Sequence, residues 1–128
     1  MNLHHIGIAV DTLEEGARQV RRLYGGQIAR EGEPVYDPLQ DADLLLFEFR
    51  DGSRMELVAG KPAQSMLGKG LNFHHVCYEV RSVESTIEEW RRQGAVVVSP
   101  PKPAVLFSGR LVAFVLTNLG LVEFLNDH

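Results

Sequence analysis

Two stretches of the chain repeat one pattern of hydrophobic and polar positions. Residues 2–10 read Asn-Leu-His-His-Ile-Gly-Ile-Ala-Val, and residues 71–80 read Leu-Asn-Phe-His-His-Val-Cys-Tyr-Glu-Val. Because side chains alternate along a strand, His5 faces away from Ile6 and His75 faces away from Val76. The pattern predicts two equivalent strands, each with one histidine on the face opposite its large apolar residues.

A capped amphipathic helix is predicted after each of these strands. Thr12 and Ser82 are suitable N-cap residues, and apolar residues follow both of them at helical spacing. Gly25-Gly26 ends the first helix, and Gly94 ends the second. The two helices therefore occupy corresponding places in two halves of the chain.

Short apolar runs separated by turn residues follow each predicted helix and indicate strands. We expect these strands at residues 27–29, 44–49 and 53–59 in the first half, and at 95–99, 110–116 and 121–125 in the second. Each half then has the order βαβββ. The predicted fold is α+β, with two tandem βαβββ modules that form a cup-shaped mixed sheet. We expect one domain over residues 1–128, with module one at 1–60, a linker at 61–70 and module two at 71–128.

Composition narrows the class of protein. The chain has 45% hydrophobic and 23% charged residues and a net charge of -4, so it offers no basic surface for nucleic acid. No apolar run reaches the roughly 18 residues of a membrane span, and the N-terminus does not read as a signal sequence. The single cysteine, Cys77, excludes an internal disulfide. We expect a cytoplasmic protein with no membrane partner.

The last predicted strand of each half carries a glutamate between apolar residues. Glu56 follows His5 by 51 residues, and Glu123 follows His75 by 48. A polar residue in a strand usually lies on an exposed face, but its recurrence in both halves favours a shared site. Two imidazoles and two carboxylates are a suitable ligand set for a divalent ion that keeps open positions for substrate.

Other polar residues near these strands have simpler interpretations. His4 and His74 fall on the helix-facing side and are expected to pack or to form hydrogen bonds. Cys77 follows His75 by two residues, and we interpret it as a small buried side chain. Lys102 and Arg110 are candidates for contact with an anionic substrate group, although an exposed, solvated position fits them equally well.

These stretches resemble the signature strands of the vicinal oxygen chelate (glyoxalase/bleomycin resistance/dioxygenase) superfamily, and within it most resemble the methylmalonyl-CoA epimerases. The resemblance covers nearly the whole chain, through His4–Val10, Met55–Leu57, His74–Val80 and Leu121–Phe124. It implies that His5, Glu56, His75 and Glu123 bind a divalent metal ion, which can be Co, Ni, Mn, Zn or Fe. The family position of Glu56 holds glutamine in some epimerases.

The implied activity is that of a metal-dependent isomerase. A proton is removed next to a metal-chelated carbonyl, giving an enolate, and is returned to the other face of the carbon. The base is a nearby carboxylate, for which we consider Glu123 and Asp43. Asp43 and Glu48 fall on opposite faces of a regular strand, and we favour Asp43 as the one that faces the site.

The resemblance is incomplete in the parts that shape a substrate pocket. Residues 103–109 replace the glycine-rich loop usual in epimerases, and the linker at 60–70 looks too short for the usual helical turns. The expected partner is a small-molecule substrate, which can be an acyl-CoA, and the superfamily favours a homodimer. Two alternatives stay open: a lyase of the glyoxalase I type, and a non-catalytic small-molecule-binding protein of the resistance type on the same fold.

Overall fold

The structure is a computed structural model that describes residues 1–128. The chain divides into two compact units. We call residues His5–His74 the N-terminal unit, and residues Met1–His4 with His75–His128 the C-terminal unit. None of the helices has the length and apolar composition that crossing a membrane requires.

The N-terminal unit contains most of β1, two α-helices, one short 3-10 helix and four further strands. Their bounds are β1 Asn2–Ala9, α1 Leu13–Tyr24, η1 Gly25–Gln27, β2 Ile28–Glu31, β3 Val35–Asp37, β4 Ala42–Phe49, β5 Arg54–Gly60 and α2 Lys61–Gly68. The strand order is β2-β4-β5-β1, with β3 paired to β4. β1 runs parallel to β5, whereas the other pairs are antiparallel. The first and last strands of this unit are therefore neighbours.

The C-terminal unit repeats this arrangement with one α-helix, one short 3-10 helix and four strands. Their bounds are β6 Phe73–Val80, α3 Val83–Arg92, β7 Val96–Pro103, η2 Val105–Phe107, β8 Leu111–Thr117 and β9 Gly120–Asn126. The strand order is β6-β9-β8-β7, with β6 parallel to β9. The predicted α+β fold with tandem βαβββ modules is confirmed. The proposed module boundaries at 60 and 71 stay a prediction.

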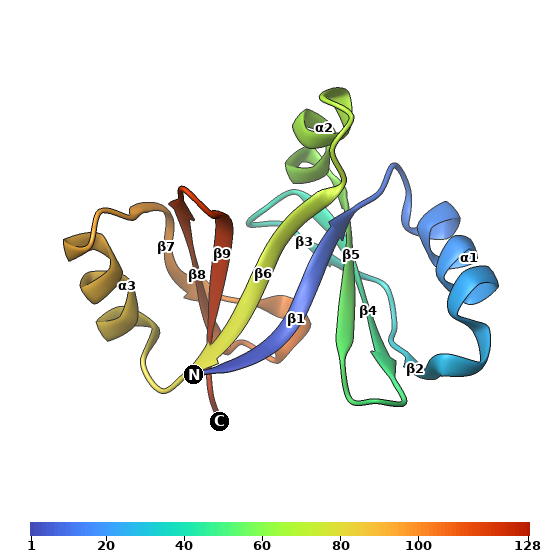
Figure 1. Cartoon of the computed structure of the whole chain (residues 1–128), viewed down its shortest axis with the longest axis horizontal. Coiled ribbons are helices and arrows are strands. Elements are labelled where there is room, and N and C mark those ends of the chain that lie inside the picture. The colour runs from blue at the N-terminus through green and yellow to red at the C-terminus, as the bar shows by residue number, and fades with distance from the viewer. The chain divides into compact units, whose positions relative to one another are not determined.

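α1 and α3 begin and pack as their sequences indicate. Thr12 Oγ1 accepts a hydrogen bond from the Glu15 N–H at 3.1 Å, and Ser82 Oγ accepts one from the Ser85 N–H at 3.1 Å. α1 covers one face of β4 and β5, beside which it lies in Figure 1. The hydrophobic core between α1 and these strands consists of Ala17, Val20, Leu45, Phe47 and Leu57.

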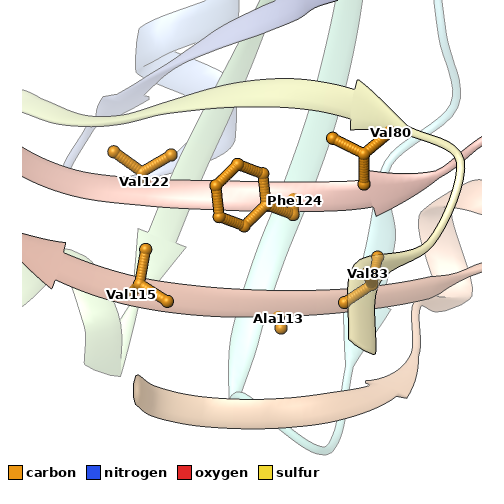
Figure 2. Close-up of a cluster of buried hydrophobic side chains, with 6 residues drawn as sticks. All are labelled: Val80, Val83, Ala113, Val115, Val122 and Phe124. Atoms are coloured by element: carbon orange, nitrogen blue, oxygen red, sulfur yellow. The ribbon is translucent and has the colours of Figure 1, made fainter. Parts of the chain in front are cut away.

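α3 covers the equivalent face of the C-terminal unit. Figure 2 shows the core there, which consists of Val80, Val83, Ala113, Val115, Val122 and Phe124. Trp90 on α3 packs against Phe124 in an edge-to-face arrangement, with ring centroids 4.7 Å apart. In both units one sheet face is thus filled by a helix. The other sheet face carries His5 and Glu56 in the N-terminal unit, and His75 and Glu123 in the C-terminal unit.

Three local predictions were wrong. The linker holds the eight-residue helix α2, because Pro62 is tolerated in the first helical turn and residues 63–67 are compatible with helix. β3 forms within the region interpreted as a loop, by pairing with β4. β7 continues through Pro100, Pro101 and Pro103, which an edge strand with register shifts can accommodate.

Candidate functional site

His5 and Glu56 form a buried pair in the N-terminal unit. Gly7 is directly opposite Glu56 in the parallel β1–β5 ladder, and His5 shares the face of Gly7 because it lies two residues away. His5 Nε2 is 3.7 Å from Glu56 Oε2. The two side chains are only 1% and 4% exposed. The structure therefore brings together the two residues that the sequence predicts as ligands in this unit.

His75 and Glu123 form the equivalent pair in the C-terminal unit. Cys77 is directly opposite Glu123 in the parallel β6–β9 ladder, and His75 shares the face of Cys77. His75 Nε2 is 3.2 Å from Glu123 Oε1. Both side chains are at least 97% buried. The same residue types, strand positions and ring nitrogen recur in the two units.

The separations within the pairs are compatible with shared coordination. Two donor atoms that lie about 2.1 Å from one ion, at right-angled or tetrahedral geometry, are about 3.0–3.4 Å apart. The His75–Glu123 separation of 3.2 Å lies in this range, and the His5–Glu56 separation of 3.7 Å is slightly longer. Each pair therefore fits two ligands of a metal ion.

Burial of these residues also requires a polar partner. Moving an ionised carboxylate out of water costs several kcal/mol or more unless a cation or hydrogen-bond donors compensate. Glu56 and Glu123 are both buried, and each has an imidazole nitrogen beside it. His5, Glu56 and His75 are ligand-bearing residues of the kinds that hold divalent metals. The donor set thus fits a divalent cation chemically.

β4 places its two acidic residues on different faces. Glu56 is directly opposite Leu46, so Glu48 shares the face of Glu56. Asp43 is opposite Ala59 and lies on the α1 side of the sheet, where it is exposed. We expected Asp43 to face the site and Glu48 to face away, and the structure shows the reverse. The sequence does not specify which face of β4 turns towards α1, because that depends on how β4 pairs with β5. The role of Asp43 as a base stays a prediction.

Asp37 was missed by sequence reasoning. It pairs with Ala42 in the β3–β4 ladder, which puts it on the same face as Glu56, and it is 2% exposed. Its carboxylate accepts hydrogen bonds from the Leu39 N–H at 2.9 Å and the Gln40 side-chain amide at 2.8 Å. The sequence signal, an Asp-Pro pair, indicates a turn but not a buried carboxylate.

Arg110 is half-buried and bonded within the protein. Its guanidinium forms an ion pair with Glu79, and its Nε donates to the Asn126 carbonyl at 2.8 Å. The hydrogen bond from Arg110 holds the pKa of the Glu79 carboxyl below its ordinary value, against the opposing effect of burial. Asn126 Oδ1 in turn accepts from the Val83 N–H at the start of α3, at 2.7 Å. Arg110, the residue before β8, therefore links the start of this strand to β6 and β9.

We expect the Glu79–Arg110 ion pair to stabilise the fold above a low pH only. Since the folded-state pKa of Glu79 is lowered, its contribution is present above the ordinary carboxyl pKa and is lost as pH falls through the lowered value. Glu79→Gln should reduce the free energy of unfolding by about 1–2 kcal/mol at pH 7. Urea unfolding of both proteins between pH 7 and pH 3 measures this difference, which should shrink towards acid pH.

Glu88→Gln is the matched control for this prediction. Glu88 also forms an ion pair with an arginine, Arg91, but both partners are exposed on α3. Surface pairs of this kind contribute little to stability. A Glu79→Gln effect that is no larger than the Glu88→Gln effect, or that persists unchanged at pH 3, would contradict a stabilising role for the Glu79–Arg110 pair.

Three further polar candidates, His4, His74 and Cys77, lie in β1 and β6. The His4 ring packs edge-to-face against Phe107 at 5.2 Å, which agrees with the packing role expected for it. His74 is 7% exposed and Cys77 is fully buried. Cys77 shares the face of His75, as strand alternation predicts.

Comparisons with known proteins find relatives in sequence and in structure. An ethylmalonyl-CoA/methylmalonyl-CoA epimerase of Cereibacter sphaeroides is 29% identical over 118 residues, which cover 88% of this chain and 85% of the relative. A hypothetical protein of Bacillus halodurans has a similar structure, with 26% identity, a TM-score of 0.74 and coverage of 99% of this chain and 94% of that one.

Solved epimerase structures share the fold. A variant of Streptomyces coelicolor methylmalonyl-CoA epimerase, in complex with 2-nitronate-propionyl-CoA, superposes with a TM-score of 0.78 at 20% identity, covering 99% of this chain and 97% of that one. Residues 4–114 match the family model of the Glyoxalase/Bleomycin resistance protein/Dioxygenase superfamily. The matched region includes both His-His strands and Glu56. The chain is a member of the Glyoxalase/Bleomycin resistance protein/Dioxygenase superfamily.

Proposed function

We propose that this protein is a metal-dependent epimerase that inverts the carbon next to the thioester carbonyl of an acyl-CoA. The observation that carries the proposal is the occurrence of one buried His–Glu pair per unit, at matched strand positions. The 29% identical relative is an ethylmalonyl-CoA/methylmalonyl-CoA epimerase, which supports the substrate class. An acyl-CoA ligand in a structure of the same fold is consistent with it.

In this proposal His5, Glu56, His75 and Glu123 are the metal ligands, one His–Glu pair from each unit. His5 and His75 would bind through Nε2, the nitrogen that each presents to its glutamate. Such binding requires the proton of each neutral ring to lie on Nδ1. When bound, a divalent ion supplies positive charge that stabilises the negative charge developing on a substrate carbonyl oxygen. The burial of all four side chains limits competition from water.

The chain must also supply a base that removes the proton and an acid that returns it to the other face. Three carboxylates are candidates for these roles: Glu123, Asp43 and Glu48. Glu123 lies within the proposed ligand set and would have to release its ligand to act. Glu48 is a diagonal cross-strand neighbour of Glu56 on the same face, so the register favours it over Asp43.

Exchange of the substrate α-hydrogen with deuterated water tests the proposed reaction. Protein purified without chelators should exchange the α-hydrogen of methylmalonyl-CoA, and treatment with a chelator should abolish the exchange until metal is restored. A panel that adds ethylmalonyl-CoA and a hemithioacetal separates epimerase from glyoxalase-type chemistry. Absence of metal-dependent exchange on every substrate, with binding of the same ligands, would instead indicate a binding protein.

A further inference from the structure

Phe114 lies beside both members of the His75–Glu123 pair. It lies directly opposite Glu123 in the antiparallel β8–β9 ladder, so the two side chains share one face. Its ring also packs edge-to-face against the His75 ring, with centroids 5.5 Å apart and an interplanar angle of 80°. Phe114 is only 7% exposed. One buried aromatic side chain thus adjoins both residues.

The orientation of a histidine ring depends on such contacts. The torsion that rotates an imidazole about its bond to Cβ has a broad energy profile, so rotamer preference alone does not fix the ring plane. Edge-to-face packing of two rings favours one mutual orientation. The ring of Phe114 therefore restricts the direction in which His75 presents Nε2.

We propose that Phe114 is a positioning residue for metal binding: it holds the His75 ring so that Nε2 stays directed at the same point as the Glu123 carboxylate. The inference rests on the proposed function, because it assumes that this pair binds a metal. The position equivalent to Phe114 in the N-terminal unit is Leu46, directly opposite Glu56. The substitution Phe114→Leu therefore introduces a residue that the fold already uses at this position.

Cobalt binding tests the role of Phe114 without relying on catalysis. Co(II) is titrated into metal-free wild-type protein and into F114L, and its visible absorption reports the coordination geometry. We expect F114L to raise the Kd for Co(II) about three- to tenfold, the scale of losing one aromatic pair. The absorption bands should shift or broaden, because His75 then samples several ring orientations. F114Y, which keeps an aromatic ring at this position, should bind Co(II) with the affinity and the absorption spectrum of wild type.

Phe124→Leu is the matched control. Phe124, drawn in Figure 2 among the core residues of this unit, is a buried aromatic residue on β9. It packs on Trp90 of α3 rather than on His75. F124L should lower the melting temperature while leaving the Kd and the spectrum of bound Co(II) within about twofold of wild type. If F114L does not fold, F114M replaces it, since methionine fills similar volume without a ring.

The outcomes separate this inference from the proposed function. If wild type binds Co(II) and loses it on H75A, but F114L and F114M bind as wild type does, then only the role of Phe114 is overturned. Equal losses of affinity in F114L and F124L would also overturn it, since a general loss of packing then explains both. If wild-type protein does not bind Co(II), the proposed function fails, and the inference fails with it.

Discussion

His75→Ala is expected to lower the rate of metal-dependent α-proton exchange by at least about 10²-fold and to deplete the purified protein of metal. Mutations of residues that only orient a ligand already cost 10–100-fold in affinity or activity, so loss of a ligand should cost more. The removed ring is 1% exposed and lies 3.2 Å from Glu123. Elemental analysis of protein purified without chelators measures metal content, and deuterium exchange into methylmalonyl-CoA measures activity.

His74→Ala provides the control within the same strand. His74 is the preceding residue and is also buried, but strand alternation directs it to the opposite face of β6. H74A should therefore retain metal and exchange activity even if its stability falls. Equal metal content in H75A and H74A, both folded, would contradict the assignment of His75 as a ligand.

The first and last strands of each unit could be predicted because their pattern is duplicated. A single His–His or a single mid-strand glutamate carries little information, but its recurrence at the same strand parity defines a face. The β1–β5 and β6–β9 ladders confirm that His5 shares its face with Glu56 and that His75 shares its face with Glu123. The helix boundaries were also accessible, since the capping residues Thr12 and Ser82 act locally.

Elements that depend on pairing or on burial were not accessible in the same way. β3 is only three residues long and forms because β4 supplies its hydrogen-bond partners. α2 has no side-chain cap, and its sequence is rich in residues that also occur in loops. Neither element has a local signal as strong as a capping box or a turn pair. Tertiary context decided both.

The chemistry of individual polar residues was predicted less well than the faces that carry them. Arg110 was a candidate for contact with an anionic substrate, but it forms a half-buried ion pair with Glu79. The sequence places a cation at position 110 and an anion at position 79, yet their 31-residue separation gives no sign of contact. The facing of Asp43 and Glu48 was not accessible for a similar reason, because a shift of register by one residue reverses every facing; the role of Asp43 as the base stays a prediction.

Glu48→Gln is expected to lower the α-proton exchange rate by about 10²–10⁴-fold, the usual contribution of a general base. The variant should keep its metal, because Glu48 is not among the proposed ligands. Its side chain lies 3.5 Å from Arg30 and is partly exposed, so the substitution should cost little stability. Asp43→Asn is the matched comparison: Asp43 lies on the same strand but on the α1 side of the sheet, and its substitution should change the exchange rate by less than about threefold.

Exchange that is lost in D43N and retained in E48Q would restore Asp43 as the base, and would require β4 to rearrange when substrate binds. Full activity in both variants would leave Glu123 as the proposed base, to be tested with E123Q at saturating metal.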